Sequence, residues 1–107
     1  MASQEQLDKS KLAMSQVIAD KLEKDPELWT IPMENLKRWM KLWGEPVAPP
    51  HLEWLTLLQE RSKEEILQIL RSPDQKANQL RQSSPFSGIL TEKERIEIIT
   101  PYIKERL

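Results

Sequence analysis

Apolar side chains recur at intervals of three and four residues along most of the chain, the spacing of helices that bury one face. The first stripe, in residues 3–23, consists of Leu7, Met14, Val17, Ile18 and Leu22. The second, in residues 32–43, consists of Met33, Leu36, Trp39, Met40 and Trp43. Between the stripes, Asp25-Pro26 is a favoured helix start, and Gly44 follows the second stripe as a favoured helix end. The pattern predicts two amphipathic helices, with a single helical turn after Pro26.

The segment Trp29–Leu58 holds all four tryptophans of the chain. Each buried aromatic side chain covers roughly 150–250 Å², so we expect this segment to organise the hydrophobic core. Its second half predicts a helix that starts at Pro49 or Pro50. The apolar residues of that helix point to nearly all sides: Leu52, Trp54, Leu55, Leu57 and Leu58. A helix with so little polar surface is expected to be central and covered by the others.

The C-terminal half contains two further helix starts of the capping-box type, Ser62 with Glu65 and Thr91 with Glu94; Ser3 with Gln6 gives a third near the N-terminus. The segment 73–82 has only two apolar residues, so we expect a helix on the surface. In the last segment, a stripe of Ile96, Ile99 and Ile103 is expected to face the core. Pro101 interrupts this segment, which predicts two short helices or one kinked helix.

The fold class predicted from these patterns is all-α. Only two glycines accompany eight prolines, and β-branched residues never alternate with polar ones over a strand length. We expect residues 1–107 to form a single compact domain, an irregular bundle of five to seven short helices punctuated by prolines. Residues 1–5 carry little apolar surface and are expected to fray.

Composition and charge exclude several classes of protein. The chain has 16 Lys and Arg against 17 Asp and Glu, a net charge of −1, which argues against a dominant polyanion-binding role. It has no cysteine, which removes disulfide scaffolds and thiol chemistry. Its N-terminus is polar, unlike a signal peptide, and no run approaches the roughly 20 apolar residues of a membrane span. We therefore expect a cytoplasmic protein without membrane contact.

Side chains suited to catalysis or metal binding are scattered. His51 is the only histidine, and zinc rarely accepts a remainder of carboxylates alone, so we expect this side chain to be solvated or to cap a helix. The acidic pairs lie in first helical turns, where the helix dipole favours negative charge. The serines near residue 84 lack a neighbouring base and a strand–turn–helix elbow. The sequence predicts a protein that is not an enzyme and has no cofactor or metal.

Two surfaces are candidates for binding a partner. On the last helix, Ile98 and Tyr102 are apolar but lie outside the stripe that is expected to face the core. Phe86 lies in the preceding turn. We expect these three residues to contact a second copy or another protein. Alternatively, Arg71, Lys76 and Arg81 lie in and beside the amide-rich segment 73–82 and suit a nucleic-acid-binding surface.

The segment Leu80–Leu90, LRQSSPFSGIL, followed by Glu94-Arg95, is the most distinctive part of the chain. It resembles a segment of short bacterial proteins without assigned chemistry. Some of those are small partners encoded beside other factors, as antitoxins are. The resemblance covers roughly the C-terminal third and implies an interaction protein, such as an antitoxin or a regulatory adaptor. It implies no functional residue.

Overall fold

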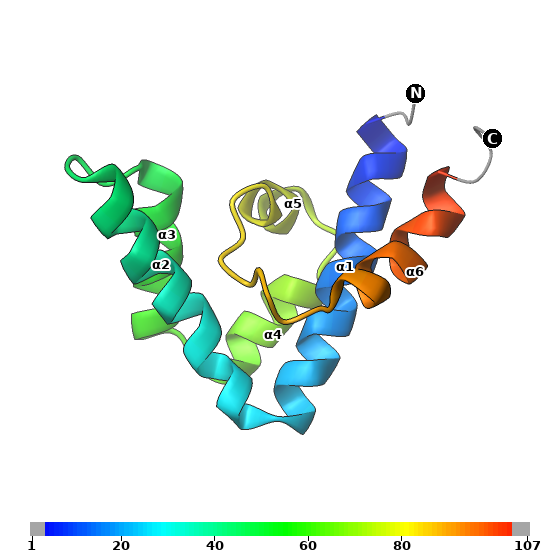
Figure 1. Ribbon diagram of the computed structural model, residues 1–107, viewed down its shortest axis with the longest axis horizontal. Helices are drawn as coiled ribbons and strands as arrows, with labels where there is room; N and C mark the ends of the chain where they lie inside the picture. Colours follow the sequence, from blue (N-terminus) through cyan, green and yellow to red (C-terminus); the bar gives the residue numbers. More distant parts are fainter. Residues whose placement is uncertain (1–3, 104–107) are drawn as a thin grey trace.

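The computed structural model describes residues 4–103 as an all-α fold, which confirms the predicted class. Its elements are α1 (Gln4–Lys24), the 3-10 turn η1 (Pro26–Trp29), α2 (Thr30–Trp43), α3 (Pro49–Glu60), α4 (Lys63–Arg71), α5 (Gln75–Arg81) and α6 (Glu92–Ile103). Figure 1 shows a V, with α2 and α3 in one arm and α1 and α6 in the other. The radius of gyration is 14.3 Å. It exceeds the value of about 13 Å expected for a compact chain of this length, as an open V should.

The helix at the centre of the packing is α1, which contacts η1, α4, α5 and α6. The prediction that the helix starting at Pro49 is central was wrong, because α3 packs chiefly against α2 and its Leu52 is 51% exposed. Small residues explain the role of α1. The buried Ser15 and Ala19 let neighbouring backbones approach closely, and the Ser15 hydroxyl donates a hydrogen bond of 2.6 Å to the Leu70 carbonyl.

The hydrophobic core lies where the two arms meet. Its fully or nearly fully buried members are Ala19, Leu22, Leu36, Trp54, Ile66, Leu70, Leu80, Phe86 and Ile89. Only one of the four tryptophans, Trp54, is among them, although Trp29 and Trp39 pack against this cluster. The segment Trp29–Leu58 therefore supplies part of the core, and the rest comes from α1, α4, α5 and the turn after α5.

Helix starts follow the predicted capping chemistry closely. The Asp25 side chain accepts a hydrogen bond from the Glu27 N–H at the start of η1. Ser62 and Glu65 form a reciprocal capping box at α4. Thr91 and Glu94 form another at α6, with N···O distances of 2.9 and 3.1 Å. The predicted cap at Ser3 lies outside the described residues, and so does the side chain of Ile103. Gln4 and Glu5 are helical.

The segment 73–82 is exposed over most of its length, as expected, but its inner face is buried. Its helix, α5, begins after Asp74, whose side chain accepts from the Ala77 N–H, and it sits between the arms of the V (Figure 1). Ala77, Leu80 and Arg81 are all buried there. Because α5 is short, two apolar side chains suffice to cover its inner face.

The last helix is turned differently from the prediction. Ile96 is 52% exposed, whereas Ile98, Ile99 and Tyr102 are half-buried. An ion pair of 2.6 Å between Lys21 of α1 and Glu94 of α6 accompanies this orientation. Since Ile98 and Tyr102 follow Glu94 at intervals of four residues, they share its face toward α1. Pro101 lies inside one continuous helix. None of the described helices combines the length and apolar character that crossing a membrane requires.

Candidate functional site

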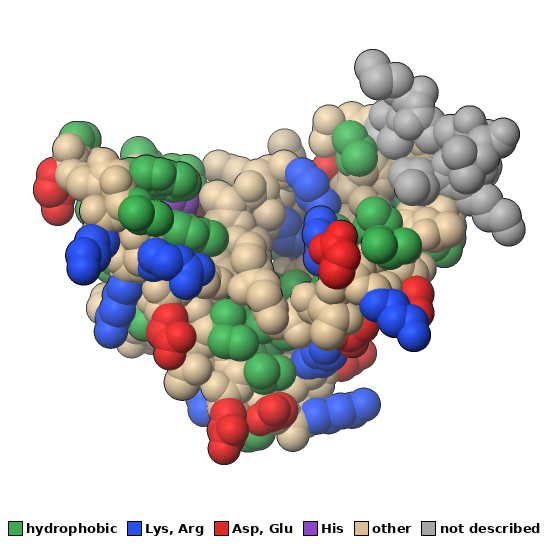
Figure 2. Space-filling model, viewed as in Figure 1, with side chains coloured by type: hydrophobic (Ala, Val, Ile, Leu, Met, Phe, Trp, Pro, Cys, Tyr) green, Lys and Arg blue, Asp and Glu red, His purple; other side chains and the backbone are tan. Residues whose placement is uncertain are grey.

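Among the residues that the structure describes, five large apolar side chains are exposed, and three of these come from the end of α2 and the start of α3. Leu42 and Trp43 at the end of α2 are each 69% exposed, and Leu52 lies in the first turn of α3. We call these three residues the tip patch. Figure 2 shows hydrophobic side chains gathered over the outer end of this arm. Exposed apolar residues scattered singly are ordinary, but a cluster of them is typical of an interaction site.

The backbone that presents the tip patch is fixed by a glycine and by prolines. Gly44 adopts φ +67°, and its N–H donates 2.9 Å to the Met40 carbonyl, which ends α2. Three prolines then limit the connection to few conformations, and α3 begins at Pro49. A surface held in one conformation loses little entropy on binding, so this geometry suits recognition.

His51 packs against Trp43 of the tip patch. Its ring packs against both neighbouring indoles, with centroids 5.2 Å from Trp39 and 5.3 Å from Trp43. The two indoles are themselves 6.5 Å apart and nearly parallel. The expectation that this histidine is solvated or caps a helix was wrong, because the side chain is buried in the stack. The stack fixes one face of Trp43 and leaves the rest of its ring open to a partner.

Positive charge borders the tip patch on α2. Lys37, Arg38 and Lys41 are exposed along the helix that carries Leu42 and Trp43. Arg38 donates to the Asn35 amide oxygen, and the two lysines make no ion pair with any described residue. Figure 2 shows Lys and Arg side chains beside the hydrophobic group. An apolar patch with unpaired cations at its edge is complementary to a surface that is apolar at its centre and acidic at its rim.

The three residues predicted to form a partner contact do not form one surface. Phe86 is 1% exposed and packs against Trp54 in the core, so its assignment to an exposed contact was wrong. The segment around it folds inward because Asn35 of α2 donates to the carbonyls of Pro85 and Ser87, at 2.7 and 2.9 Å. Ile98 and Tyr102 are half-buried on the face of α6 that packs on α1.

The three cations of the alternative nucleic-acid surface each have a partner within the protein. Arg71 pairs with Asp20 and Glu23, and these hydrogen bonds raise its pKa above the ordinary value. Lys76 pairs with Glu53 at 2.6 Å. Arg81 is buried and donates to the carbonyls of Ile69 and Ser72, and its burial lowers its pKa. The structure does not bring them together as a free cationic surface.

One member of the tip patch, Leu42, could have been identified from the helical pattern of the sequence. This residue follows Arg38 at an interval of four, so it lies on the charged face of α2, away from the stripe of Leu36 and Trp39. A large apolar residue on a charged face is a sequence-level sign of an interaction site. No such sign exists for the stacking of His51, which depends on how α3 packs on α2.

Within residues 4–103, no group of three His, Asp or Glu side chains is placed to bind a metal ion. Comparisons of the chain with protein-family models, with curated proteins and with solved structures found no match. The physical features of the tip patch are therefore the basis for a functional assignment.

Proposed function

We propose that this protein is a non-enzymatic interaction protein that binds another protein through the tip patch. The observation that carries the proposal is the exposure of Leu42 and Trp43, each 69%, side by side at a rigid helix end. Tryptophan is among the residues that contribute most to binding energy at protein interfaces. A regulatory adaptor or an antitoxin-like partner is the role we favour, and the resemblance of Leu80–Leu90 to small bacterial partner proteins supports it.

The partner that fits this patch has an apolar pocket with Asp and Glu at its rim. Trp43 would fill the pocket, since its ring is already held on one side by His51. Lys37 and Lys41 would meet the acidic rim, because they have no ion pair within the described part of the chain. Charges at a rim mainly raise the rate of association and select the partner, whereas the buried aromatic ring contributes most of the affinity.

Nucleic acid fits the patch less well than protein does. Stacking on bases requires exposed aromatic faces, and two of the three members of the patch are leucines. The overall charge of −1 gives little long-range attraction for phosphate. A nucleic-acid ligand is therefore the second candidate, favoured only by the cations on α2.

A photo-crosslinking amino acid at position 42 tests the proposal directly. In the native host it should couple to one protein, while the same group at Gln59, exposed at the other end of α3, should not. The purified partner should then bind with 1:1 stoichiometry, and Trp43→Ala should weaken binding by about 2 kcal/mol or more. Lys41→Glu should slow association, and Lys63→Glu, an exposed cation of α4, is its matched control.

Three outcomes would contradict the proposal. Crosslinking of position 42 to RNA or DNA, with affinity that falls steeply as salt rises, would favour the nucleic-acid candidate. Crosslinking only to a second copy of the chain would show self-association. A partner that binds Trp43→Ala as well as the parent protein would place the interface elsewhere.

A further inference from the structure

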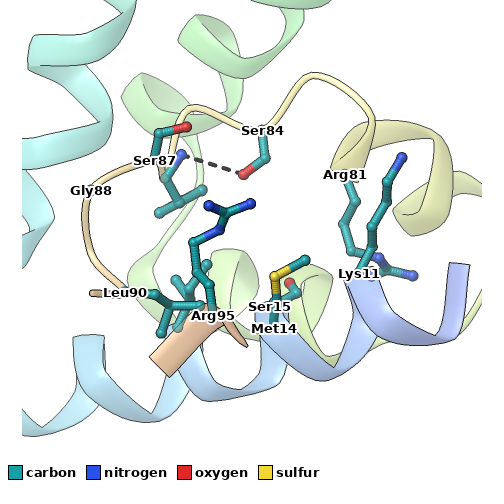
Figure 3. A pocket seen from close by; sticks show the side chains of 11 residues that line it. Lys11, Met14, Ser15, Arg81, Ser84, Ser87, Gly88, Leu90 and Arg95 are labelled. Carbon is teal, nitrogen blue, oxygen red and sulfur yellow. Dashed lines mark hydrogen bonds between the residues drawn. The ribbon is translucent and has the colours of Figure 1, made fainter. Parts of the chain in front are cut away.

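A cavity of about 150 Å³ lies on the other side of the molecule's centre from the tip patch, between α1, the turn after α5 and the start of α6. Its apolar part is formed by Met14, Ile18, Phe86 and Leu90. Figure 3 shows Ser84 and Ser87 on the turn above it. The cavity is open to solvent on one side, and a volume of this size has room for a molecule such as benzene. The cavity thus has the shape and the lining of a small-molecule site.

The charged groups around the cavity are all positive. Lys11 comes from α1, Arg81 from the end of α5, and Arg95 from the first turns of α6. In Figure 3 the Arg95 side chain extends into the space between α1 and the turn that carries Ser84. No carboxylate lines the cavity. Lys11 donates to Gln82, and Arg95 pairs with Glu92 at 3.0 Å, at an exposed position.

Arg81 is the unusual member of this group. It is 8% exposed and makes no ion pair within the described residues. One nitrogen, Nη1, donates to the carbonyls at the end of α4, at 2.8 Å to Ser72 and 3.4 Å to Ile69. Its Nε has no hydrogen-bond partner, and its Nη2 makes no hydrogen bond to a described residue. Asp74 and Asp8 are close enough to attract its charge, but neither forms an ion pair with it. A buried guanidinium with an unpartnered nitrogen is costly, so its hydrogen bonds to the end of α4 do not account fully for its position.

We propose that this cavity binds a small organic carboxylate with an apolar body about the size of a benzene ring. The carboxylate would lie at Arg95, whose side chain extends into this space, in a cavity whose wall Arg81 also lines. Charge-assisted hydrogen bonds form readily between a carboxylate and a guanidinium group. The apolar body would pack against Met14, Ile18 and Leu90. This ligand matches the cavity in charge, in size and in the division between polar and apolar walls. The site is separate from the tip patch and does not depend on the proposed protein partner.

The test uses benzoate as the probe and benzyl alcohol, its neutral counterpart, as the control ligand. Titration of the ¹⁵N-labelled protein with benzoate should give saturable 1:1 shifts in the amides of Ser84–Leu90. The chemical shift of the Arg81 Nε–H should change over the same benzoate range. This signal reports on Arg81 directly, so no substitution that could disturb folding is needed. Benzyl alcohol should bind at least roughly tenfold more weakly, the scale of one lost charge-assisted hydrogen bond.

Matched variants localise the anion. Arg95→Gln, at an exposed position on the cavity wall, should weaken benzoate roughly tenfold. Lys93→Gln removes the same charge two residues away, outside the cavity lining, and should leave the affinity unchanged.

Four results would overturn the carboxylate site. They are equal binding of benzyl alcohol, equal binding to Arg95→Gln, displacement of benzoate by inorganic phosphate with the same shifts, and no saturable shift at millimolar benzoate.

Discussion

The indole of Trp54 meets the ring of Phe86 edge-on, with ring centroids 5.4 Å apart and an angle of 77° between the planes. The same indole donates its Nε1–H to the Leu80 carbonyl at 2.9 Å. Trp54 of α3 therefore joins the end of α5 and the turn that follows it. This side chain joins the arm of α2 and α3 to the segment that lies between the two arms.

Truncation of this ring should be among the most destabilising substitutions in the chain. Trp54→Ala should cost about 3–5 kcal/mol, the range for buried aromatic truncations. Trp54→Phe keeps a ring but leaves the Leu80 carbonyl without its donor, so it should cost about 1–3 kcal/mol. Urea unfolding measures both. If Trp54→Ala melts within a few degrees of the parent protein, the core assignment of this residue is wrong.

Asn35 should hold the turn after α5 against α2. Asn35→Ala removes the donor to the Pro85 and Ser87 carbonyls, and each unsatisfied carbonyl costs about 1–3 kcal/mol when water cannot reach it. Hydrogen exchange should then accelerate in the segment 84–90 more than in α4. Asn78→Ala, an amide on α5, serves as the comparison. Uniform acceleration across the protein would contradict a local role for Asn35.

Acid stability should depend on Glu94. The hydrogen bond from Lys21, with a second from the Thr91 N–H, lowers the pKa of Glu94 from 4.5 to about 2. Because the folded pKa lies below the unfolded one, the charge stabilises the fold fully above pH 4.5, and this stabilisation is lost as the pH falls toward 2. The difference in urea midpoint between the parent protein and Glu94→Gln should shrink across that window.

The matched control for this titration is Glu97→Gln, an exposed glutamate of the same helix without an ion pair in the described structure. Its difference from the parent protein should stay nearly constant over the same pH range. A difference for Glu94→Gln that is equally flat would show that the ion pair with Lys21 does not affect folding.

Substitutions in the tip patch should separate binding from stability. Leu42→Ala and Trp43→Ala should each change the free energy of unfolding by about 1 kcal/mol or less, since both side chains are largely exposed. Leu36→Ala on the buried face of the same helix should cost about 2–5 kcal/mol. Thermal unfolding distinguishes the two groups. A large loss of stability for Leu42→Ala would show that this residue belongs to the core.

The capping residues determined where several of the described helices begin or end. Asp25, Ser62 and Thr91 act as caps because their side-chain oxygens satisfy N–H groups only two or three residues away. Such interactions depend on neighbours in sequence, so they can be read without knowledge of the fold. The end of α2 at Gly44 is of the same kind, because a positive φ favours glycine whatever lies around it.

The tertiary structure alone decided which face of α6 is buried and how deeply α5 and His51 are enclosed. Ile96 and Ile98 are equally apolar, yet only Ile98 lies on the face of α6 that carries Glu94, the partner of Lys21 of α1. Arg81 and His51 look like surface residues in sequence, yet the packing of α5 between the arms and of α3 on α2 buries them. Contacts between residues far apart in the chain fix these choices, and a local pattern carries no information about them. The tip patch and the cationic cavity both depend on such contacts.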